Sequence, residues 1–386
     1  MKSKGRVAVG LSGGVDSSVA AALLKEEGYS VLGLTMQIWN GKITLPAGAK
    51  EACFGPDEAE DIEACASLCE QLDIEYRVID LCTEYESRVL DYFRREYLAG
   101  RTPNPCIVCN SELKFGFLLE KAQELGLEFE YFATGHYARV ARDRDGAARL
   151  RAGLDGAKDQ SYFLYRLGPK RLSKLLFPLG ELTKAEVRER ARRFRLEVAE
   201  KPESQDFIAG GDYAALFEGR KVETGEIVDF DGHVLGKHRG LPYYTIGQRR
   251  GLGLGAAISG DSGEPEPLYV LALDPQRNRV IVGPNRGLFA EGLLASDFIC
   301  YSQTEVGPAP SRGLAKIRQN HRPAPCTYAL GEDRSCRVHF DESQRALAPG
   351  QALVIYDSDG YVLGGGTIEA SLSSLALEAP FEAPRG

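Results

Sequence analysis

The sequence predicts an α/β domain built on a parallel sheet, followed by a small β-rich central domain and a C-terminal β-barrel. In the first 200 residues, apolar runs alternate with helical stretches, which is the pattern of a parallel sheet covered by helices. From Lys201 onward, short β-prone runs are broken by Gly and Pro, as in small β domains. A chain of 386 residues is long enough for two or three domains. We place them at residues 1–205, 206–285 and 286–386.

The expected elements follow in chain order. The strands of the first domain are predicted at 7–11, 30–36, 76–81 and 129–134, with helices near 15–28, 57–72, 83–98 and 111–125 and a basic helical region at 166–198. The β-prone runs of the later domains are 225–236, 268–273, 279–283, 315–319 and 352–356. Residues 371–386 are expected to form an edge strand and a frayed end. Ligands of a parallel sheet bind at the carboxyl ends of its strands.

The charge balance is acidic overall but uneven along the chain. The chain has 47 Lys+Arg, 55 Asp+Glu and a net charge of −8, which taken alone argues against binding a polyanion. Residues 51–87 hold twelve acids and one Arg, whereas 166–195 hold ten basic residues and three Glu. The windows 235–251 and 312–322 hold four basic residues each and no acids. This discontinuous basic track predicts salt-sensitive nucleic-acid binding by all three domains, unless Glu181, Glu186 and Glu189 neutralise the helical part locally.

The sequence also indicates a compartment. No stretch approaches the roughly 18 to 20 apolar residues of a membrane span, and the first residues do not form a signal sequence. The nine cysteines are an odd number in a long chain without an export signal. We therefore expect a cytoplasmic protein whose cysteines are thiols, metal ligands or catalytic groups.

A glycine-rich segment joins the first predicted strand to the first helix. The strand 7–11 runs directly into Ser12-Gly13-Gly14-Val15-Asp16-Ser17-Ser18. Paired glycines let the backbone approach a phosphate, the helix N-terminus presents free N–H groups, and the serines add hydroxyls. A P-loop would need a lysine, and a dinucleotide fingerprint would need spaced glycines. The segment therefore predicts a pyrophosphate cradle, against the alternative of an ordinary Gly-Gly turn.

A Cys-x2-Cys pair forms the second candidate site. Cys106 and Cys109 follow Pro103-Asn104-Pro105 and precede a helix that we expect to begin near Asn110. A helix N-terminus lowers a thiol pKa and favours the thiolate that attacks electrophiles, carries a persulfide or binds metal. Structural zinc would need a second such pair, which the chain lacks.

The remaining cysteines receive a simpler interpretation. Cys65 and Cys69 share one face of a predicted helix and are expected in the core, because free cysteine is commonly buried. The same holds for the cysteines in strand-like or apolar settings, Cys82, Cys300, Cys326 and Cys336. Cys53 differs, because it is expected in a loop just before a helix at the exit side of the strands. It is a candidate to join Cys106 and Cys109.

The Ser-Gly-Gly-x-Asp-Ser segment resembles the PP-loop of ATP pyrophosphatases, which cut ATP to AMP and pyrophosphate while adenylating a substrate oxygen. By that resemblance Asp16 would help to hold Mg²⁺, and Met36 would lie against adenine. The nucleotide-binding positions would be Gly10, Leu11, Ser12, Gly13, Gly14, Val15, Asp16, Ser17, Met36 and Gly135.

Further motifs in the same order are similar to those of the tRNA-specific 2-thiouridylase family, over most of the chain. They are residues 10–18, 100–110, 133–139, 158–164, 244–253 and 315–318. The resemblance implies a PP-loop domain, a small middle domain and a β-barrel. It also implies that ATP adenylates O2 of the wobble uridine in the tRNA anticodon loop. Sulfur, brought by a donor protein and carried as an enzyme persulfide, then replaces that oxygen. We expect a monomer.

The family's site residues carry over by position. Cys109 matches the sulfur-handling nucleophile, and Asn104, Pro105 and Cys106 match the segment beside the flipped-out target base. Gly135 matches a nucleotide-contacting backbone position. The positions that match tRNA contacts are His136, Lys158, Asp159, Gln160, Arg318, Gln319 and Gln351. For His136 the alternative of a catalytic base stays open.

Two positions depart from the family pattern. In the best-known form of the family, residue 106 is an aspartate and a second catalytic cysteine occurs in a Ser-x-x-Ile-Cys-Phe-Ile segment. This chain has Ser204-Gln205-Asp206-Phe207-Ile208 instead. The family scheme, in which two cysteines finish as a disulfide, does not transfer unchanged. Either Cys106 takes the missing partner's role, or Cys53, Cys106 and Cys109 hold an iron–sulfur cluster with one iron open to bind sulfide. We favour the cluster.

Two other functions remain to be tested against this one. A PP-loop synthetase acting on a small carboxylate or a purine nucleotide would need no loop cysteines. A non-catalytic RNA-binding or redox protein of the same fold would release no pyrophosphate from ATP when tRNA is added.

Overall fold

The first compact unit is built on a parallel sheet, as the sequence predicts. The computed structural model describes residues 4–45, 52–142, 146–202, 206–208, 213–254, 258–259, 265–301 and 309–372. Unit 1 comprises residues 1–91, 105–216 and 360–362, and unit 2 comprises 92–104, 217–359 and 363–386. The sheet of unit 1 has the order β4-β2-β1-β5-β8, and all neighbouring strands run parallel. Its strands are β1 (Arg6–Gly10), β2 (Ser30–Gln37), β4 (Glu75–Asp80), β5 (Tyr131–Thr134) and β8 (Leu175–Leu176).

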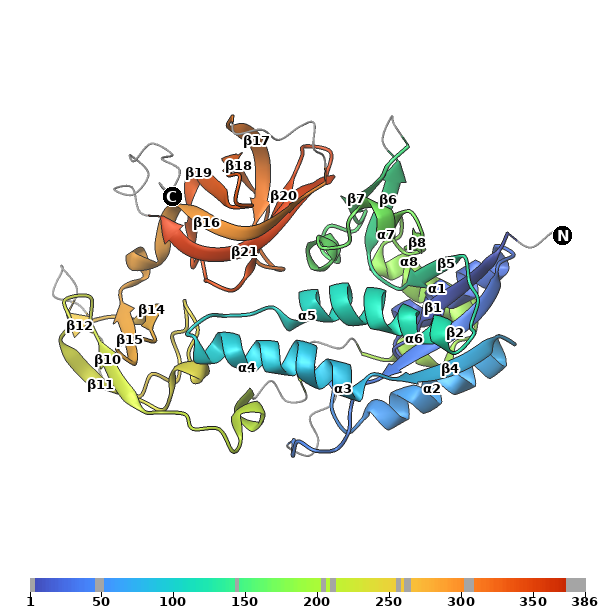
Figure 1. Cartoon of the computed structure of the whole chain (residues 1–386), viewed down its shortest axis with the longest axis horizontal. Helices are drawn as coiled ribbons and strands as arrows, with labels where there is room; N and C mark the ends of the chain where they lie inside the picture. The colour runs from blue at the N-terminus through green and yellow to red at the C-terminus, as the bar shows by residue number, and fades with distance from the viewer. Residues whose placement is uncertain are drawn as a thin grey trace. The chain divides into compact units, whose positions relative to one another are not determined.

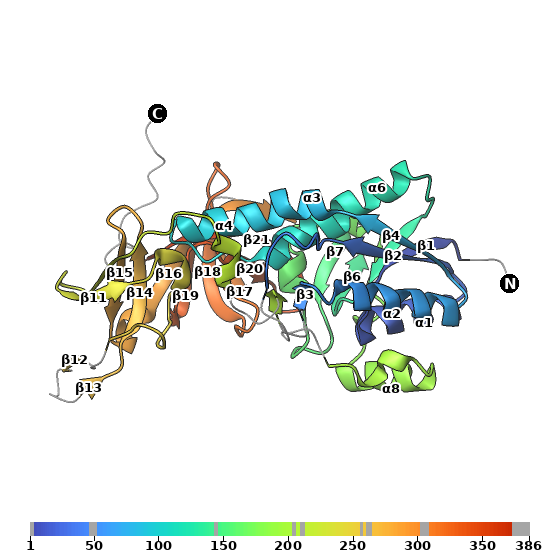
Figure 2. The same cartoon turned by 90° about the horizontal axis from the view of Figure 1, so that it is seen from below.

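Helices cover both faces of this sheet, which explains its nearly continuous apolar strands. Val7 and Val9 point to one face, where they share a core with α1 (Val15–Glu26), α2 (Glu58–Gln71) and α8 (Lys184–Arg193). On the other face, Phe115 packs edge-on against Phe132, with ring centroids 5.5 Å apart. Figure 1 shows the sheet in blue and green beside these helices, and Figure 2 shows α1, α2 and α8 together on one side of it.

Unit 1 contains further short elements. They are β3 (Ala52–Phe54) paired with β9 (Asp206–Ile208), the hairpin β6 (Ala138–Arg142) and β7 (Ala148–Ala152), α3 (Cys82–Tyr85), the π-helical turn η1 (Glu86–Leu90), α5 (Pro105–Val108), the π-helical segment η2 (Cys109–Phe117), α6 (Leu118–Glu124), η3 (Ser161–Leu164), α7 (Pro169–Leu172), η4 (Glu197–Glu200) and η6 (Tyr213–Phe217).

Unit 2 begins at Tyr92, within α4 (Asp91–Leu98), and contains a mixed sheet and a closed barrel. The sheet has the order β11-β10-β15-β14, from β10 (Gly225–Val228), β11 (Val234–His238), β14 (Tyr269–Asp274) and β15 (Arg279–Gly283). A ribbon of β12 (Ile258–Ser259) and β13 (Pro265–Glu266) and the turns η7 (Leu241–Tyr243) and η8 (Asn285–Leu288) accompany it. The barrel, orange to red in Figure 1, closes in the order β16-β19-β18-β17-β20-β21. Its strands are β16 (Phe289–Cys300), β17 (Ser311–Lys316), β18 (Ala324–Leu330), β19 (Cys336–Arg345), β20 (Ala352–Tyr356) and β21 (Val362–Leu372).

The predicted fold class is confirmed, with corrections to single elements. The basic region near 166–198 was expected to be helical, but it also contains β8, because Leu175 and Leu176 pair with β5 at the sheet edge. The run at 315–319 is shifted, since β17 ends at Lys316. The tail from 373 lies outside the described residues, and the domain boundaries stay a prediction. Among the described residues, we find no helix with the length and apolar character to cross a membrane.

Candidate active site

The loop between β1 and α1 has the geometry of an anion cradle. β1 ends at Gly10, α1 begins at Val15, and Gly14 is the residue that caps this helix. Gly13 has a φ of +67°, and a Cβ there would lie 2.7 Å from Oδ1 of Asp61. A side chain at this position would be strained and would clash, so residue 13 has to be glycine.

The hydroxyls of the loop serve different purposes. The Ser17 Oγ accepts a hydrogen bond from the Ser12 amide at 3.2 Å, and the Ser18 Oγ donates to the Gly14 carbonyl at 2.8 Å. Both side chains are buried, so they hold the shape of the loop. Ser12 is exposed, and its hydroxyl is therefore accessible to a ligand.

Other predicted nucleotide positions lie at the same edge of the sheet. Because β1, β2 and β5 are parallel, Met36 near the end of β2 and Gly135 just after β5 lie at their carboxyl ends. A Cβ on Gly135 would lie 2.6 Å from the Asp16 carbonyl carbon and from the Ser17 nitrogen. Gly135 therefore lets the backbone after β5 pack directly against the first turn of α1.

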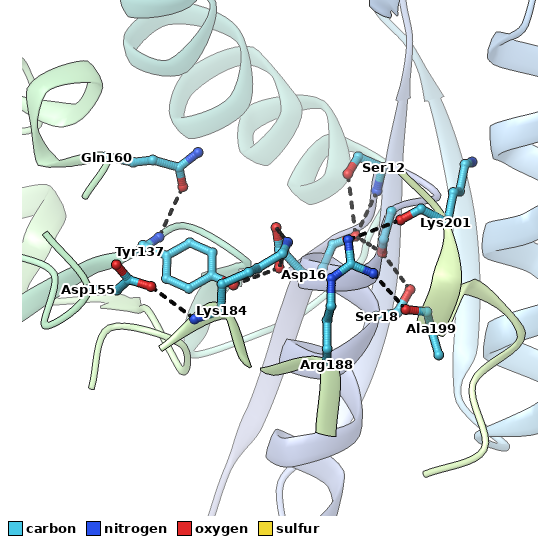
Figure 3. Close-up of polar contacts among 12 residues, drawn as sticks. Ser12, Asp16, Ser18, Tyr137, Asp155, Gln160, Lys184, Arg188, Ala199 and Lys201 are labelled. Atoms are coloured by element: carbon cyan, nitrogen blue, oxygen red, sulfur yellow. Dashed lines mark hydrogen bonds and ion pairs between the residues drawn. The ribbon is translucent and has the colours of Figure 1, made fainter. Parts of the chain in front are cut away.

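Asp16 is held by two residues that the sequence analysis did not identify. The Lys184 Nζ donates to both carboxylate oxygens of Asp16, at 2.8 and 2.9 Å, and the Tyr137 hydroxyl donates to Oδ1 at 2.8 Å (Figure 3). Both oxygens thus already accept hydrogen bonds. A metal ion at Asp16 would have to replace the lysine as its partner.

A second lysine lies at the other end of the loop. The Lys201 Nζ donates to the Gly13 carbonyl at 3.0 Å and to Asp61 Oδ1 at 2.6 Å. On the inner side, the Gly13 amide donates to the Cys65 sulfur at 3.0 Å. Cys65 is buried as expected, but it contacts the loop directly. The motif Thr183-x-x-Glu186 could have predicted the start of α8, but nothing in the sequence places Lys184 or Lys201 against the loop.

The Cys-x2-Cys segment differs from the prediction. The helix begins at Pro105 as α5 and continues as η2 from Cys109, so both cysteines lie inside the helical segment and not before its first turn. Proline favours a first helical position, because its fixed φ suits the helix and its missing N–H costs nothing there. Cys109 is one turn away from the free N–H groups that would stabilise a thiolate.

The ionisation of Cys109 changes accordingly. The pKa of the Cys109 thiol is raised to about 11: burial is the main cause, Lys114 opposes it, and a charge on Cys53 adds a smaller increase. The prediction of a lowered pKa at this position was therefore wrong, because desolvation outweighs the helix terminus and the lysine. In the chain as described, Cys109 is a thiol at neutral pH.

One buried tyrosine is affected electrostatically by three cysteines. Tyr85 is 2% exposed and stacks on Phe54 at 5.1 Å. Burial raises the pKa of Tyr85 well above its usual value, and charges on Cys109, Cys53 and Cys106 raise it further. Cys53, expected in a loop, lies in β3, which pairs with β9 through Ala52–Asp206 and Phe54–Ile208. β9 belongs to the segment where the family's second cysteine was expected; Ser204 and Gln205 lie outside the described residues.

The thiols do not form a site for a single ion. Among the described residues, three possible ligand atoms lie within 4.8 Å of one another at Asp229, Asp231 and His233, and not at Cys53, Cys106 and Cys109. The carboxylate of Asp229 bonds to the backbone of the other two, which closes the hairpin turn between β10 and β11. A cluster of several metal atoms spaces its ligands more widely than one ion does, so this result concerns a single ion only.

The predicted tRNA contacts in unit 1 have distinct surroundings. His136 is half-buried between Phe115 and Phe177, and its Nδ1 lies 2.8 Å from the Thr134 hydroxyl. Burial, aided by Lys114, holds the pKa of His136 well below its usual value, so the ring is neutral at pH 7. Asp159 is buried and accepts hydrogen bonds from the Gly153 and Ser161 amides, both at 3.0 Å.

The neighbours of Asp159 complete this loop. The Gln160 Oε1 accepts from the Tyr137 amide at 3.0 Å, and Lys158 is half-buried. Gln160 therefore holds the backbone of the tyrosine that contacts Asp16 (Figure 3). Asp159 and Gln160 shape the loop, whichever residues contact RNA.

The predicted tRNA contacts in unit 2 gather at one end of the barrel. β17 and β20 are antiparallel, with Lys316 opposite Val354, so the residues that follow β17, Arg318 and Gln319, lie at the same end as Gln351 before β20. The Thr102 amide donates to the Pro349 carbonyl at 2.7 Å, which brings the segment before Asn104 to this end as well.

An arginine fixes this segment to the barrel. The Arg101 guanidinium bonds to both oxygens of Glu369 at 2.6 and 3.1 Å, and its Nε bonds to Glu96 at 2.8 Å. Glu369 also accepts from the Ser296 hydroxyl at 2.5 Å. The residues just before the target-base segment are thus held by β16 and β21.

The basic windows are partly neutralised. Arg312 pairs with both oxygens of Asp341, at 2.7 and 2.6 Å, and Arg193 and Arg192 pair with Glu26 and Glu200. The sequence analysis expected Glu181, Glu186 or Glu189 to neutralise the helical window. Instead, Glu186 caps α8, and Glu181 pairs with Arg139, which lies outside that window. The salt-sensitive nucleic-acid binding stays a prediction.

The fold and this loop define a class. A parallel sheet whose first strand leads through Ser-Gly-Gly into a helix, with further candidate residues at the same carboxyl edge, belongs to the nucleotide-binding α/β enzymes of the PP-loop type. Comparison with known families gives three matches along the chain. The tRNA methyl transferase HUP domain matches residues 5–209, the tRNA methyl transferase PRC-barrel domain matches 215–284, and the aminomethyltransferase beta-barrel domain matches 291–368.

Curated relatives define the family. The chain is 45% identical to the tRNA-specific 2-thiouridylase MnmA of Geotalea uraniireducens, over 96% of each chain. It is 46% identical to the enzyme of the same name from Carboxydothermus hydrogenoformans, over 95% of this chain and 98% of the relative. Among solved structures, a 4-thiouridine synthetase–RNA complex with bound ATP matches 56% of this chain and 46% of its own at 16% identity, with a TM-score of 0.32. This chain belongs to the family of tRNA-specific 2-thiouridylases.

Proposed function

We propose that this chain is an ATP-dependent tRNA sulfurtransferase that converts wobble uridine 34 to 2-thiouridine and releases AMP and pyrophosphate. The observation that carries this proposal is the 45% identity, over 96% of the chain, to relatives named tRNA-specific 2-thiouridylase. The loop from Ser12 to Ser18 and the thiol of Cys109 supply the two chemical functions that the reaction requires. We propose that it acts as a monomer in the cytoplasm and receives sulfur from a donor protein.

The first half-reaction makes O2 of uracil a leaving group. O2 attacks the α-phosphorus of ATP, the bond to the β-phosphate breaks, and pyrophosphate leaves. The amides of Gly13 and Gly14, at the start of α1, are placed to stabilise the charge that develops on pyrophosphate. Asp16 would hold Mg²⁺ together with the phosphates, once Lys184 has moved away, and Mg²⁺ would neutralise the same charge.

The target base has to leave the anticodon stack before it can react, which costs a few kcal/mol. We assign its immediate contacts to Asn104, Pro105 and Cys106. The residues assigned to the rest of the tRNA are His136, Lys158, Asp159, Gln160, Arg318, Gln319 and Gln351. Since His136 is neutral and enclosed by aromatic rings, it suits a hydrogen bond or a stacking contact better than a phosphate contact.

The second half-reaction delivers sulfur through Cys109. We favour an iron–sulfur cluster held by the thiolates of Cys53, Cys106 and Cys109, which would supply an iron that binds the transferred sulfide. The alternative is a persulfide on Cys109 or Cys106, with the other thiol resolving it.

Pyrophosphate release tests the proposed function. The purified chain, ATP and wobble-uridine tRNA should release pyrophosphate, and omission of tRNA should abolish the release. Release that does not depend on tRNA would favour a PP-loop synthetase that acts on a small substrate. Absence of any release, from protein that binds tRNA, would favour a non-catalytic RNA-binding protein.

Anaerobic purification decides between the two routes for sulfur. The cluster predicts iron and acid-labile sulfide bound to the protein, and loss of both in Cys53→Ser and in Cys109→Ser. A colourless, iron-free protein that is fully active would reject the cluster and leave the persulfide route.

A further inference from the structure

Lys184 has a fixed backbone beside the nucleotide loop. It is the first residue of α8, where Thr183 and Glu186 form a capping box: the Glu186 carboxylate accepts from the Thr183 amide at 2.7 Å. The Lys184 amide donates to Asp155 Oδ2 at 3.0 Å (Figure 3). The start of α8 is therefore held by its own cap and by a neighbouring loop.

The side chain of Lys184 extends from this anchor to the loop. It is only 13% exposed, and its Nζ lies 5.8 Å from the centroid of the Tyr137 ring. The ammonium group ends on the carboxylate of Asp16, in the first turn of α1. Burial of the stem and the fixed start of α8 keep the ammonium group beside the loop, while rotation about the last side-chain bonds lets it change partner.

Lys201 approaches the same loop from the end of η4. Its Nζ bonds to the Gly13 carbonyl and to Asp61. Arg188 of α8 donates to the Ala199 carbonyl at 2.9 Å and to the Lys201 carbonyl at 3.5 Å. The helix that carries Lys184 thus also positions the backbone of Lys201, and both ammonium groups lie at the β1–α1 loop.

The acidic side chains at this loop would repel a polyphosphate unless positive charges lay beside them. Asp16 and Asp61 place two carboxylates where a polyphosphate would bind, and like charges at short range repel. The loop has no lysine of its own, in contrast to a P-loop. Lys184 and Lys201, which are distant in sequence, supply the two positive charges.

We propose that Lys184 and Lys201 bind the β- and γ-phosphates of ATP and hold pyrophosphate as it leaves; this rests on the proposed use of ATP at the same loop. The two ammonium groups bond to Asp16 and Asp61 in the structure. When a nucleoside triphosphate binds, they turn to the phosphate oxygens, and the carboxylate of Asp16 becomes available to a divalent cation. Charge-assisted bonds to phosphate are among the strong hydrogen bonds of proteins.

Binding measurements on the full-length chain test this assignment. Isothermal titration with pyrophosphate, the non-hydrolysable analogue AMP-PNP and AMP, in the presence of Mg²⁺, is compared for wild type, Lys184→Gln and Lys201→Gln. Each substitution should weaken pyrophosphate and AMP-PNP binding about 10- to 100-fold, as for loss of a hydrogen bond to a charged group. AMP, which lacks the β- and γ-phosphates, should bind within about twofold of wild type.

Lys25→Gln is the matched control. Lys25 lies in the last turn of α1, at the opposite end from the loop, and its ammonium group bonds to the Leu72 and Asp73 carbonyls. All three ligands should bind to this variant as to wild type. The rise in Tm that pyrophosphate induces gives a second measurement, and the half-exposed Lys201 provides a test that does not depend on folding of the Lys184 variant.

Two results would overturn the assignment. One is unchanged pyrophosphate and AMP-PNP binding in both variants; the other is an equal loss for AMP, which would indicate a structural role. A different result would contradict the proposed function alone. If the chain binds pyrophosphate through both lysines but makes no 2-thiouridine, the phosphate-binding assignment holds and the proposed thiolation does not.

Discussion

The nucleotide loop and the cysteine segment of unit 1 contrast in how their chemistry arises. In the loop, the residues that define the geometry are adjacent: Gly13 adopts a positive φ, Gly14 caps α1, and Ser17 and Ser18 bond within the loop. In the cysteine segment, the chemistry depends on distant residues, because burial raises the pKa of Cys109 to about 11 and Cys53 contributes from β3. A short motif specifies backbone geometry, but the state of a thiol depends on what surrounds it.

The largest expected effect is the loss of thiolation when Cys109 is replaced, while the reaction at the nucleotide loop continues. Cys109→Ser should reduce formation of 2-thiouridine by at least about 10³-fold, as expected when a nucleophile is removed. The loop is untouched, so tRNA-dependent pyrophosphate release in the first turnover should persist. Quench-flow assays with labelled ATP and nucleoside analysis measure the two steps. Cys82→Ser, a half-buried cysteine outside the group of three, is the control and should retain both activities.

If Cys109→Ser lost pyrophosphate release and thiolation to the same extent, the two regions would not be separable. The cysteine would then be part of the adenylation step as well.

The raised pKa of Cys109 predicts an unusual alkylation profile. With a pKa of about 11, the thiolate is scarce at pH 8, so iodoacetamide should label Cys109 in the metal-free protein about 100-fold more slowly than glutathione. Because the pKa is raised and not lowered, the rate should continue to increase with pH above 9. Peptide mass spectrometry over pH 7 to 10.5 measures the profile. A plateau below pH 8 would show that the helix terminus, and not burial, dominates.

Gly135→Ala tests whether the loop depends on packing as well as on its own residues. The added Cβ would lie 2.6 Å from the backbone of Asp16 and Ser17, which cannot move aside as a flexible side chain would. Overpacking of about 1–3 kcal/mol should weaken ATP binding about 10- to 100-fold. Gly156→Ala is the control, because a Cβ at Gly156 has no neighbour within 4 Å. Equal ATP affinity for both variants would contradict the close approach of the backbone at Gly135.

The smallest expected effect concerns the anchoring of the target-base segment. Arg101 and Arg312 each pair with both oxygens of a carboxylate, but Arg101 is 23% exposed and Arg312 is 62% exposed. Arg101→Gln should lower the free energy of unfolding by about 1–3 kcal/mol, and Arg312→Gln by clearly less, because solvent screens the exposed pair. Urea denaturation measures both. Equal losses of stability would mean that the bonds of Arg101 to Glu96 and Glu369 stabilise the chain no more than a surface ion pair does.

The sequence predicted the backbone conformation of the nucleotide loop and of the sheet better than the side chains that pack around the loop. Alternating apolar runs and the Ser-Gly-Gly motif predicted the parallel sheet and the loop, because both depend on residues close together in the chain. The start of the helix at Pro105 could have been predicted from the proline itself. Lys184, Lys201 and Tyr137 could not, because their contacts with the loop arise only when α8, η4 and the segment after β5 pack around α1. The β6–β7 hairpin and the strand β8 were missed for the same reason, as short elements stabilised by tertiary pairing.

Mass spectrometry of the nucleosides of treated tRNA tests the proposed function most directly. Unmodified tRNA with a wobble uridine is incubated anaerobically with the chain, ATP and Mg²⁺, in one reaction with a sulfide source and in a parallel reaction with a persulfide donor, and is then digested. We predict 2-thiouridine at position 34 with wild type and none with Cys109→Ser. Absence of 2-thiouridine in both reactions, with wild-type protein that binds ATP and tRNA, would contradict the assignment of this chain as a tRNA 2-thiouridylase.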